Sequence, residues 1–394
     1  MTMITSDWRP LANGCTAWFE APSPPAGVEL VRRIAGLSQA TRMPALEVRP
    51  QGVRVTVAAA EPDLAEAISA AARDLDLTAD PTGLSSLRVQ VAATEPAAVR
   101  AFWQTVFGYR ADGSGLIDPS RRDPMIMVGE LTEPRPLRNR IHVDVVRPPA
   151  AVSAVRTELR REPYGAFGVT LADTEGNEID LVPGGRLPAG PDTADWHTVF
   201  GAMVHYPVTS ATTAAELAAA TVALAHHAAI PLLIDLRHDG VTIDSGKDGW
   251  EEDPERFTEL AGQVQDAARR LGLTADPSRL RFVQFGVDAI DIPAVQGFWA
   301  TTLGLQADHR DWLTDRYDPR RLLPVIFFQD LDRDDHERRR QRNRIRLELQ
   351  VPHDRATARL ETALGAGGRL LSGDGDRHVV ADPEGNELII VARH

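Results

Sequence analysis

The sequence predicts an α+β fold in which two kinds of small domain each occur twice. Residues 8–80 correspond to residues 196–276, and residues 85–188 correspond to residues 280–394. A match over spans of this length marks an internal duplication. Each copy in the first pair has the pattern helix, strand pair, helix, whereas each copy in the second pair has a βαβββ pattern twice. The predicted fold class is therefore α+β, in two repeats of two domains.

Four domains follow from this duplication, at residues 1–84, 85–188, 189–279 and 280–394. A chain of 394 residues is long enough for several domains of ordinary size. The segment 182–195 is rich in Pro and Gly, so we expect it to link the two repeats.

Composition and charge exclude several classes of protein. The net charge of −13 argues against nucleic acid and anionic membranes as partners, because both attract Lys and Arg. Cys15 is the only cysteine, which excludes an internal disulfide and a thiolate metal cluster. Residues 1–10 lack the apolar run of a signal peptide, and no stretch has the roughly 20 apolar residues of a membrane span. We expect a cytoplasmic protein.

Arginine is concentrated in the segment 330–346, which includes Arg338-Arg339-Arg340, Arg342 and Arg344. Acidic residues are interspersed among these arginines. The mixed signs favour a solvated surface loop or helix over a nucleic-acid site.

The first pair of domains has clear strand and helix signals. Val53, Val55 and Val57 alternate with polar residues, as in a half-buried strand. Pro62 and Pro254 each mark a helix start, because proline at the first helical position loses no hydrogen bond. The apolar helical stripes that follow are Leu64, Ile68, Ala71, Ala72 and Leu75 in one copy, and Phe257, Leu260, Ala261, Val264, Ala268 and Leu271 in the other.

These two domains resemble the pterin-4a-carbinolamine dehydratase family, an α+β fold of similar size. The resemblance places that family's His-His-Pro motif at Arg42-Met43-Pro44 and at Ile230-Pro231. It places the Thr-His-Asp motif near Ala58-Ala59-Ala60 and Ser245-Gly246-Lys247. None of the catalytic histidines is present there, and His226-His227 lies about one helical turn too early for this chemistry. We expect degenerate domains that act as scaffolds, with His226-His227 a solvated or capping pair.

The second pair of domains carries three motifs in the same order. Phe102-Trp103 lies on a helix that ends at Gly108, and Phe298-Trp299 repeats this before Gly304. Residues that we expect to form a strand follow each of these helices. The second motif is the polar entry to a strand, Arg138-Asn139-Arg140 and Arg342-Asn343-Arg344, whose asparagines are expected to satisfy backbone groups. The third is a hairpin around Asp173-Thr174-Glu175-Gly176-Asn177-Glu178 and Asp382-Pro383-Glu384-Gly385-Asn386-Glu387.

Together these motifs resemble the glyoxalase/bleomycin-resistance/extradiol-dioxygenase superfamily, also called vicinal oxygen chelate. The resemblance implies paired βαβββ units that curl into a cleft, where side chains at fixed strand positions hold a divalent metal. Those positions fall near Arg88, Gly129-Glu130, His142 and Asp180 in the first domain. In the second domain they fall near Gln284, Gln329, Arg346 and Ile389. Whether the domains pair within one chain or between the chains of a homodimer is open.

The strand periodicity supports part of this assignment. Apolar residues alternate with His142 and Asp144, and Asp180 alternates in the same way, so these side chains share a polar face. His142 and Asp180, with Glu130 as the third ligand, are suitable for a divalent metal. Arg88 opposes this reading, because a guanidinium repels a cation. The alternative is a neutral His142 bonded to Asp144 or Asp180, with Arg88 paired to a carboxylate.

In the second domain Arg346 and Ile389 argue against a metal. A cleft without metal could still bind a polar or anionic small molecule through Arg88, Asp144, Gln284, Gln329 and Arg346. His142 would act as the acid or base, oriented by a carboxylate such as Asp180.

Three functions are consistent with the sequence. The first is a small-molecule enzyme or binder of the vicinal oxygen chelate type, such as a lyase or isomerase. The second is ligand sequestration without catalysis, as in bleomycin-resistance proteins, and the third is residual pterin-4a-carbinolamine dehydratase activity. The sequence does not name the substrate.

Overall fold

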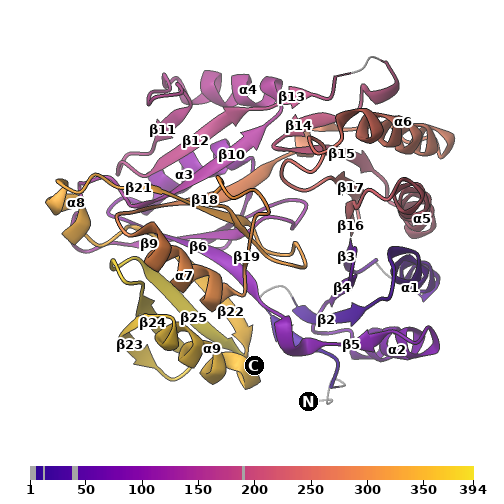
Figure 1. The fold of residues 1–394 in the computed structure, drawn as a ribbon, viewed down its shortest axis with the longest axis horizontal. Coiled ribbons are helices and arrows are strands. Elements are labelled where there is room, and N and C mark those ends of the chain that lie inside the picture. The colour runs from indigo at the N-terminus through magenta and orange to yellow at the C-terminus, as the bar shows by residue number, and fades with distance from the viewer. Residues whose placement is uncertain (1–5, 12–13, 38–42, 189–190) are drawn as a thin grey trace. The chain divides into compact units, whose positions relative to one another are not determined.

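The chain folds into two compact units, each built from two separate segments. The computed structural model describes residues 6–11, 14–37, 43–188 and 191–394 (Figure 1). Unit 1 combines residues 1–84 with 184–281, and unit 2 combines residues 85–183 with 282–394. Each unit therefore contains one segment from each repeat. Within the described residues, no helix has both the length and the apolar character that a bilayer span requires.

Unit 1 contains a 10-stranded sheet in the order β1-β2-β4-β3-β16-β17-β15-β14-β13, with β5 paired to β2. Its four long helices lie on one face of this sheet (Figure 1). The first segment supplies β1 (Arg9–Leu11), β2 (Gly14–Glu20), α1 (Pro24–Leu37), β3 (Ala45–Arg49), β4 (Gly52–Val57), α2 (Pro62–Asp74), β5 (Thr78–Ala79) and η2 (Pro81–Gly83). The second supplies β13 (Gly185–Arg186), η3 (Pro191–Thr193), β14 (His197–Val199), β15 (Gly201–Pro207), α5 (Ala211–Ala228), β16 (Leu233–Arg237), β17 (Gly240–Asp244), α6 (Pro254–Arg270) and η4 (Pro277–Arg279).

The two copies in unit 1 join through the antiparallel strands β3 and β16, where Glu47 lies opposite Asp235. Arg49 pairs with Asp235 at 2.7 Å, and Arg237 pairs with Glu47 at 2.5 Å. All four side chains are buried, so each charge needs its partner. The strands β3 and β16, which are equivalent in the two copies, therefore form the junction between them.

Two features of unit 1 differ from the prediction. The strands β2 and β15 precede the first helix of each copy and carry Trp18-Phe19 and His205-Tyr206. Both strands are buried along nearly their whole length, so they lack the alternation that marks a half-buried strand. The segment 182–195, predicted as a linker, supplies β13 to the edge of this sheet. The predicted helix starts at Pro62 and Pro254 are confirmed.

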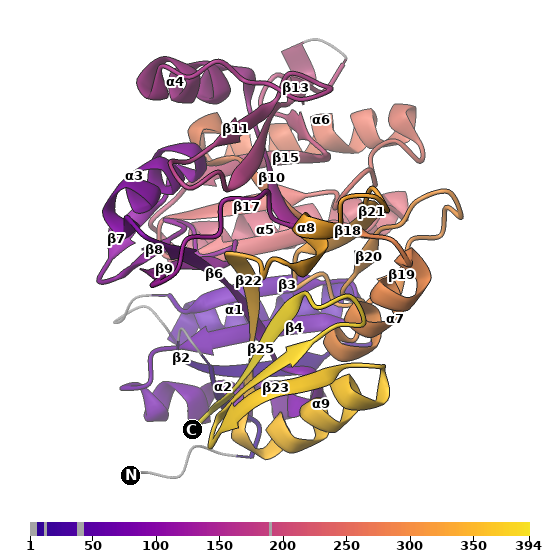
Figure 2. The same ribbon diagram turned by 90° about the vertical axis from the view of Figure 1, so that its left-hand side faces the viewer.

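Unit 2 contains two sheets, of seven and eight strands. In Figure 2, α9 lies along the strands β23 and β25 of the larger sheet. The first segment supplies β6 (Ser86–Ala93), α3 (Pro96–Phe107), β7 (Arg110–Asp112), β8 (Gly115–Ile117), β9 (Met125–Glu130), β10 (Ile141–Arg147), α4 (Pro149–Leu159), β11 (Thr170–Ala172) and β12 (Glu178–Pro183). The second supplies β18 (Phe282–Ala289), α7 (Ile292–Leu303), β19 (Gln306–Ala307), β20 (Arg316–Tyr317), β21 (Val325–Asp330), α8 (His336–Arg340), β22 (Ile345–Pro352), α9 (His353–Gly365), β23 (Arg369–Asp374), β24 (Arg377–Ala381) and β25 (Glu387–Arg393).

Each sheet of unit 2 contains half of each copy. The 7-stranded sheet has the order β11-β12-β10-β18-β21-β20-β19, and the 8-stranded sheet has the order β23-β24-β25-β22-β6-β9-β8-β7. The copies meet at two antiparallel junctions, β10 with β18 and β22 with β6. Pairing of the βαβββ units, which the sequence left open, thus occurs within this chain. It divides each copy between the two sheets.

The repeated Arg-Asn-Arg motif forms a reciprocal clasp between the copies of unit 2. Asn139 accepts a hydrogen bond at Oδ1 from the backbone N of Arg344, at 2.7 Å. Asn343 accepts one from the backbone N of Arg140, at 2.8 Å. The expectation that these asparagines satisfy backbone groups is confirmed, and the groups belong to the opposite copy. All four residues are buried, so the clasp is part of the core.

The closing motif connects this clasp to the helix with Phe-Trp. Asn177 accepts at Oδ1 from Nδ2 of Asn139 and donates its own Nδ2 to Asp173. Asp173 also accepts from the indole of Trp103, and Glu175 accepts from backbone amides at the start of α3. The same contacts recur in the second copy through Asn386, Asn343, Asp382, Trp299 and Glu384. These contacts explain the Asp, first Glu and Asn of the motif by folding, because each of the three has a structural partner.

The arginine-rich segment 330–346 is only partly a solvated surface. Arg338 and Arg344 are buried, and Arg338 on α8 donates to the backbone oxygen of Asn139 and to Asp288. The mixed charges predicted an exposed segment, because composition does not show which single arginine in such a run is buried.

Candidate functional site

One face of the 7-stranded sheet carries a cluster of polar side chains, which we call the His142 face. It comprises His142, Asp144, Asp180, Thr170, Gln284, Asp288 and Gln329. The register explains why they share a face. Asp144 lies opposite Asp180 on one side and Gln284 on the other, while His142 lies opposite Gly286. The intervening residues Ile141, Val143 and Val145 point into the core.

His142 lies between two carboxylates at the centre of this face. Its Nε2 is 3.6 Å from Asp144, and its Nδ1 is 3.8 Å from Asp288. Both distances are too long for hydrogen bonds, although the side chain of His142 is only 7% exposed. The buried Nδ1 has no hydrogen-bond partner among the described residues. The imidazole therefore keeps hydrogen-bonding capacity that the described protein does not use.

Packing, rather than hydrogen bonding, positions the imidazole. A Cβ added to Gly286 would lie 2.2 Å from Cε1 of His142 and 2.7 Å from Cζ of Phe327. Only glycine leaves room at this position of β18 for the ring above it. Phe327 packs its edge against the imidazole, with ring centroids 5.5 Å apart.

The carboxylates of the face are held by donors from neighbouring strands. Gln284 donates to Asp144 at 2.8 Å, and Gln329 donates to Asp288 at 2.7 Å. Thr170 donates to Asp180 at 2.6 Å. These bonds fix the carboxylates, since charge-assisted hydrogen bonds are short and strong.

The His142 face fits a divalent metal ion. One ligand atom from each of His142, Asp144 and Asp180 lies within 4.8 Å of the others. The amide oxygen Oε1 of Gln284 is buried and has no hydrogen-bond partner among the described residues, as is true of Nδ1 of His142. Imidazole, carboxylate and amide oxygen are together suited to ions such as Mn²⁺, Fe²⁺ or Zn²⁺.

The corresponding face of the 8-stranded sheet has a different chemistry, and we call it the Arg346 face. It comprises Arg346, Arg88, Gln90, Glu348, Ile389 and Glu387. Glu348 lies opposite Arg88 and Ile389 in the register, as Asp144 lies opposite Gln284 and Asp180. Arg346 therefore occupies the position of His142.

Ion pairs cover only part of the positive charge on the Arg346 face. Arg346 contacts Glu387 at 3.3 Å, and Arg88 lies 4.0 Å from Glu348. The buried Nε atoms of Arg88 and Arg346 have no hydrogen-bond partner among the described residues. Burial lowers the pKa of Arg88, the charge of Glu348 opposes this, and Arg393 lowers it further. An anion beside Arg88 would favour its charged form.

Glu387 is the anchor of this second face. Burial alone would raise the pKa of its carboxyl group, but a hydrogen bond from Arg342 and the charges of Arg342 and Arg346 outweigh burial, and the pKa is lowered. Both nitrogens Nε and Nη2 of Arg342 donate to this carboxylate.

The structure thus divides the residues predicted from the sequence. His142, Asp144, Asp180, Gln284 and Gln329 come together on the His142 face. Arg88 and Arg346 lie together on the other sheet. Glu130, predicted as a third metal ligand with His142 and Asp180, is at the end of β9 in the 8-stranded sheet, so Asp144 takes its place. The predicted obstacle to a metal, Arg88, lies on the 8-stranded sheet with Arg346.

Several residues of the His142 face were missed from the sequence. The alternation of side chains along a strand could have identified Gly286 and Asp288, because both lie on the same face of β18 as Gln284. Phe327 stands two residues before Gln329 and shares its face. No local sequence pattern could have identified Arg338 as a partner of Asp288, because only the tertiary fold brings α8 next to β18.

Comparison with known proteins supports a family assignment. The model of the glyoxalase-like domain matches residues 88–182 and 284–391, which together are more than half of the chain. Both matches lie in unit 2. No curated protein matches the chain in sequence.

Solved structures show weaker likenesses. A mutant glyoxalase I from Zea mays shares 9% identity, with 78% of this chain and 94% of that chain covered and a TM-score of 0.39. A glyoxalase/bleomycin resistance protein/dioxygenase family enzyme from Burkholderia phytofirmans PsJN shares 16% identity, over 27% of this chain and 94% of that chain, with a TM-score of 0.22. A glyoxalase-related enzyme from Fulvimarina pelagi shares 20% identity, over 28% and 86%, with a TM-score of 0.22. The family model alone carries the assignment.

Proposed function

The chain belongs to the glyoxalase-like domain family, and on this premise we propose that it is a small-molecule enzyme whose working site is the His142 face. The observation that carries the proposal is the state of His142. Its imidazole is buried and held by packing between two fixed carboxylates, 3.6 Å and 3.8 Å away, while its Nδ1 has no hydrogen-bond partner among the described residues. A structural histidine in the core usually has its nitrogens satisfied.

In this proposal His142 moves a proton to or from a bound polar molecule. An imidazole can both accept and donate a proton, so His142 can serve as acid or base. Asp144 and Asp288 flank its ring at 3.6 and 3.8 Å, and Asp288 is also paired with Arg338. Gln284 and Gln329 hold these carboxylates in place, and they come from the opposite copy. The site therefore requires both halves of the duplication.

A divalent metal ion is the alternative occupant of this face and would be held by His142, Asp144 and Asp180, with the amide oxygen of Gln284 beside them. His142 would then serve as a ligand in place of the acid or base. Such an ion supplies a Lewis acid that polarises an oxygen of the substrate. The excess of carboxylates favours a metal or a neutral or cationic polar group over an anion at this face.

The proposal is tested by metal titration of the full chain. Calorimetry with Zn²⁺ and Mn²⁺ compares the parent with His142→Ala and with Arg346→Ala, which changes the corresponding position of the other sheet. All proteins carry His353→Ala and His394→Ala to remove an exposed histidine pair. We expect His142→Ala to weaken binding at least tenfold, about 1.4 kcal/mol, and Arg346→Ala to leave it unchanged. Equal metal affinity in all three proteins would show that His142 does not bind the metal.

Anion sequestration by the Arg346 face is the second candidate function. It is favoured by the half-buried side chains of Arg88 and Arg346, whose buried Nε atoms lack hydrogen-bond partners among the described residues. Titration with inorganic phosphate should raise the melting temperature, because a ligand bound to the native state alone stabilises it. Arg346→Gln should abolish this rise, whereas His142→Gln should keep it. A rise that survives Arg346→Gln would place the anion elsewhere.

Residual pterin-4a-carbinolamine dehydratase activity has less support. A cavity of about 280 Å³ in unit 1 is lined by His226, Arg49 and Ile230-Pro231 among mainly apolar residues. His226 is among its lining residues, but the second histidine position of that family's first motif holds Met43 in one copy and Ile230 in the other. Arg42, in the same motif, is outside the described residues. We expect a carbinolamine dehydration assay to give the uncatalysed rate.

A further inference from the structure

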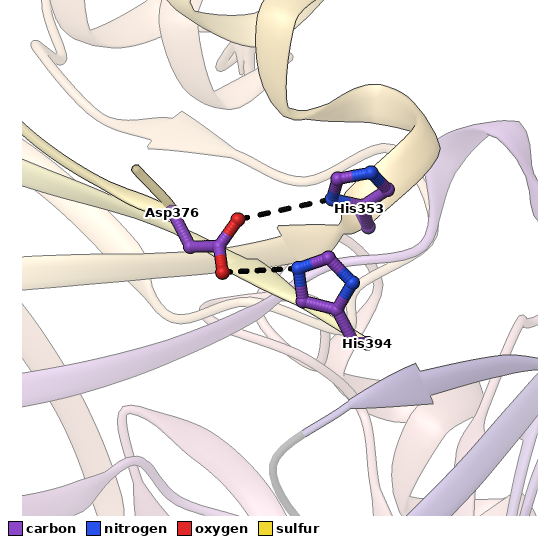
Figure 3. Close-up of side chains that lie close together, drawn as sticks. All are labelled: His353, Asp376 and His394. Atoms are coloured by element: carbon purple, nitrogen blue, oxygen red, sulfur yellow. Dashed lines mark ion pairs between the residues drawn. The ribbon is translucent and has the colours of Figure 1, made fainter. Parts of the chain in front are cut away.

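A second histidine cluster lies in unit 2 and shares no residue with the His142 face. His353, Asp376 and His394 point toward one another (Figure 3). Nε2 of His394 is 3.0 Å from one carboxylate oxygen of Asp376, and Nδ1 of His353 is 3.8 Å from the other. The two imidazole centroids are 4.0 Å apart. All three side chains are more than half exposed.

Three elements of the fold bring these residues together. His353 is the first residue of α9, Asp376 lies in the turn between β23 and β24, and His394 follows β25 directly. The parallel pair β22 and β25 places Pro352 opposite Arg393, so the residues that follow leave the sheet side by side. The turn is tied to β25, because the backbone N of Ala392 donates to the carbonyl of Asp376 at 2.8 Å. The cluster therefore rests on regular structure.

We propose that His353, Asp376 and His394 bind a divalent transition-metal ion such as Zn²⁺ or Cu²⁺. Two imidazole nitrogens and a carboxylate are ligands that both ions prefer. Their ligand atoms lie within 4.8 Å of one another. With metal–ligand bonds of about 2.0–2.2 Å, two ligand atoms of one ion lie up to roughly 4 Å apart. Rotation of exposed side chains closes the remaining distance at low cost.

The exposure of the cluster determines what kind of site it is. Three protein ligands leave at least one coordination position to water or to a donor from another molecule. The polar surroundings give the ion no enclosed cavity, which distinguishes it from the buried face around His142. The structure therefore points to a metal centre at the surface with an open coordination position.

Electron paramagnetic resonance of the full chain with one equivalent of Cu²⁺ tests this site. The parent carries His142→Ala, so that the proposed site in the 7-stranded sheet does not compete. We expect hyperfine structure from two nitrogen ligands. His353→Ala and His394→Ala should each reduce this to one nitrogen and weaken Cu²⁺ binding at least tenfold. Asp376→Asn should weaken binding but keep both nitrogens.

The matched control is His238→Ala. His238 is an exposed histidine 3.6 Å from Asp239, but this pair lacks a second imidazole. The His238→Ala substitution should leave the Cu²⁺ spectrum and the affinity for Cu²⁺ unchanged. A two-nitrogen spectrum that persists in both His353→Ala and His394→Ala would overturn the proposal, as would a parent that shows no nitrogen ligand. Neither result depends on whether His142 binds a metal, because every protein in this series lacks that histidine.

Discussion

The His142 face and the Arg346 face occupy equivalent positions in the two sheets of unit 2, yet they suit opposite ligands. His142 corresponds to Arg346, and Gln284 corresponds to Arg88. The first face has carboxylates around an imidazole, whereas the second has arginines around Glu348 and Glu387. The same backbone thus presents a mainly acidic set of side chains once and a mainly basic set once, so the fold does not determine the chemistry of the face.

What the two faces share is the clasp. Asn139 and Asn343 bond the opposite copy with nearly equal distances of 2.7 and 2.8 Å. The closing motifs repeat every contact with a tryptophan and a helix start. The asparagines of the clasp, which are identical in both copies, therefore hold the fold, whereas the two faces differ most at the positions of His142 and Arg346 and of Gln284 and Arg88.

The largest effect is expected from the buried arginines of the clasp. Arg140 donates to the carbonyl of Glu384, and Arg344 donates to Asn177 and to the carbonyl of Leu137. Each of the variants Arg140→Leu and Arg344→Leu removes the hydrogen bonds of a buried, charged guanidinium group, so each should lower the free energy of unfolding by about 3 kcal/mol. Urea denaturation measures this. A loss in only one of the two variants would show that the clasp is not symmetric.

An intermediate effect is expected from Gly286→Ala. The added Cβ would meet His142 and Phe327 at 2.2 and 2.7 Å, so the imidazole must move, at a cost of about 1–3 kcal/mol. Metal binding at the His142 face should weaken as well. The control is Gly129→Ala in the other sheet, at the position corresponding to Gln329, where an added Cβ meets no atom within 4 Å. Equal stability of the two variants would contradict the packing argument.

The smallest effect concerns pH and the Arg346 face. The pKa of Glu387 is lowered in the folded protein, where burial is outweighed by Arg342 and Arg346. Its contribution to stability is therefore complete above the unfolded value near 4.5 and is lost as the pH falls through the lower folded value. Glu387→Gln should be less stable than the parent at pH 6 by about 1 kcal/mol.

Below pH 4.5 this difference should shrink progressively, because Glu387 of the parent takes up a proton as the pH falls through its lowered folded pKa. Glu251→Gln, an exposed acid in unit 1, serves as the control for the loss of one carboxylate. Unfolding free energies at pH 6 and pH 3.5 decide the matter. A difference that grows as the pH falls would reverse the assigned sign.

The repeats and the polar periodicity of the strands could be predicted from the sequence, because both are local. Alternation placed His142 and Asp144 on one face, and the contacts of the structure agree. The exchange of halves could not be predicted, since either pairing of the βαβββ units buries the same apolar residues. For this reason Glu130 and Arg88 were expected beside His142, whereas they lie in the other sheet.

The clasp shows a second limit of local pattern. The sequence indicated that Asn139 would satisfy a backbone group, but the group belongs to a residue 205 positions away. Likewise, the closing motif was predicted only as a hairpin, whereas its Asp173, Glu175 and Asn177 hold a tryptophan, a helix start and another asparagine. A polar residue near a site is assigned to folding or to function only when its partners are known.

The central claim is that the His142 face, assembled from both copies, is the working site of the chain. Its most direct test is anomalous diffraction at the zinc edge from crystals of the full chain grown with Zn²⁺. We expect an anomalous peak in contact with His142, Asp144 and Asp180, and no peak beside Arg346. Crystals with zinc bound at His353 and His394 but with no density beside His142 would contradict it.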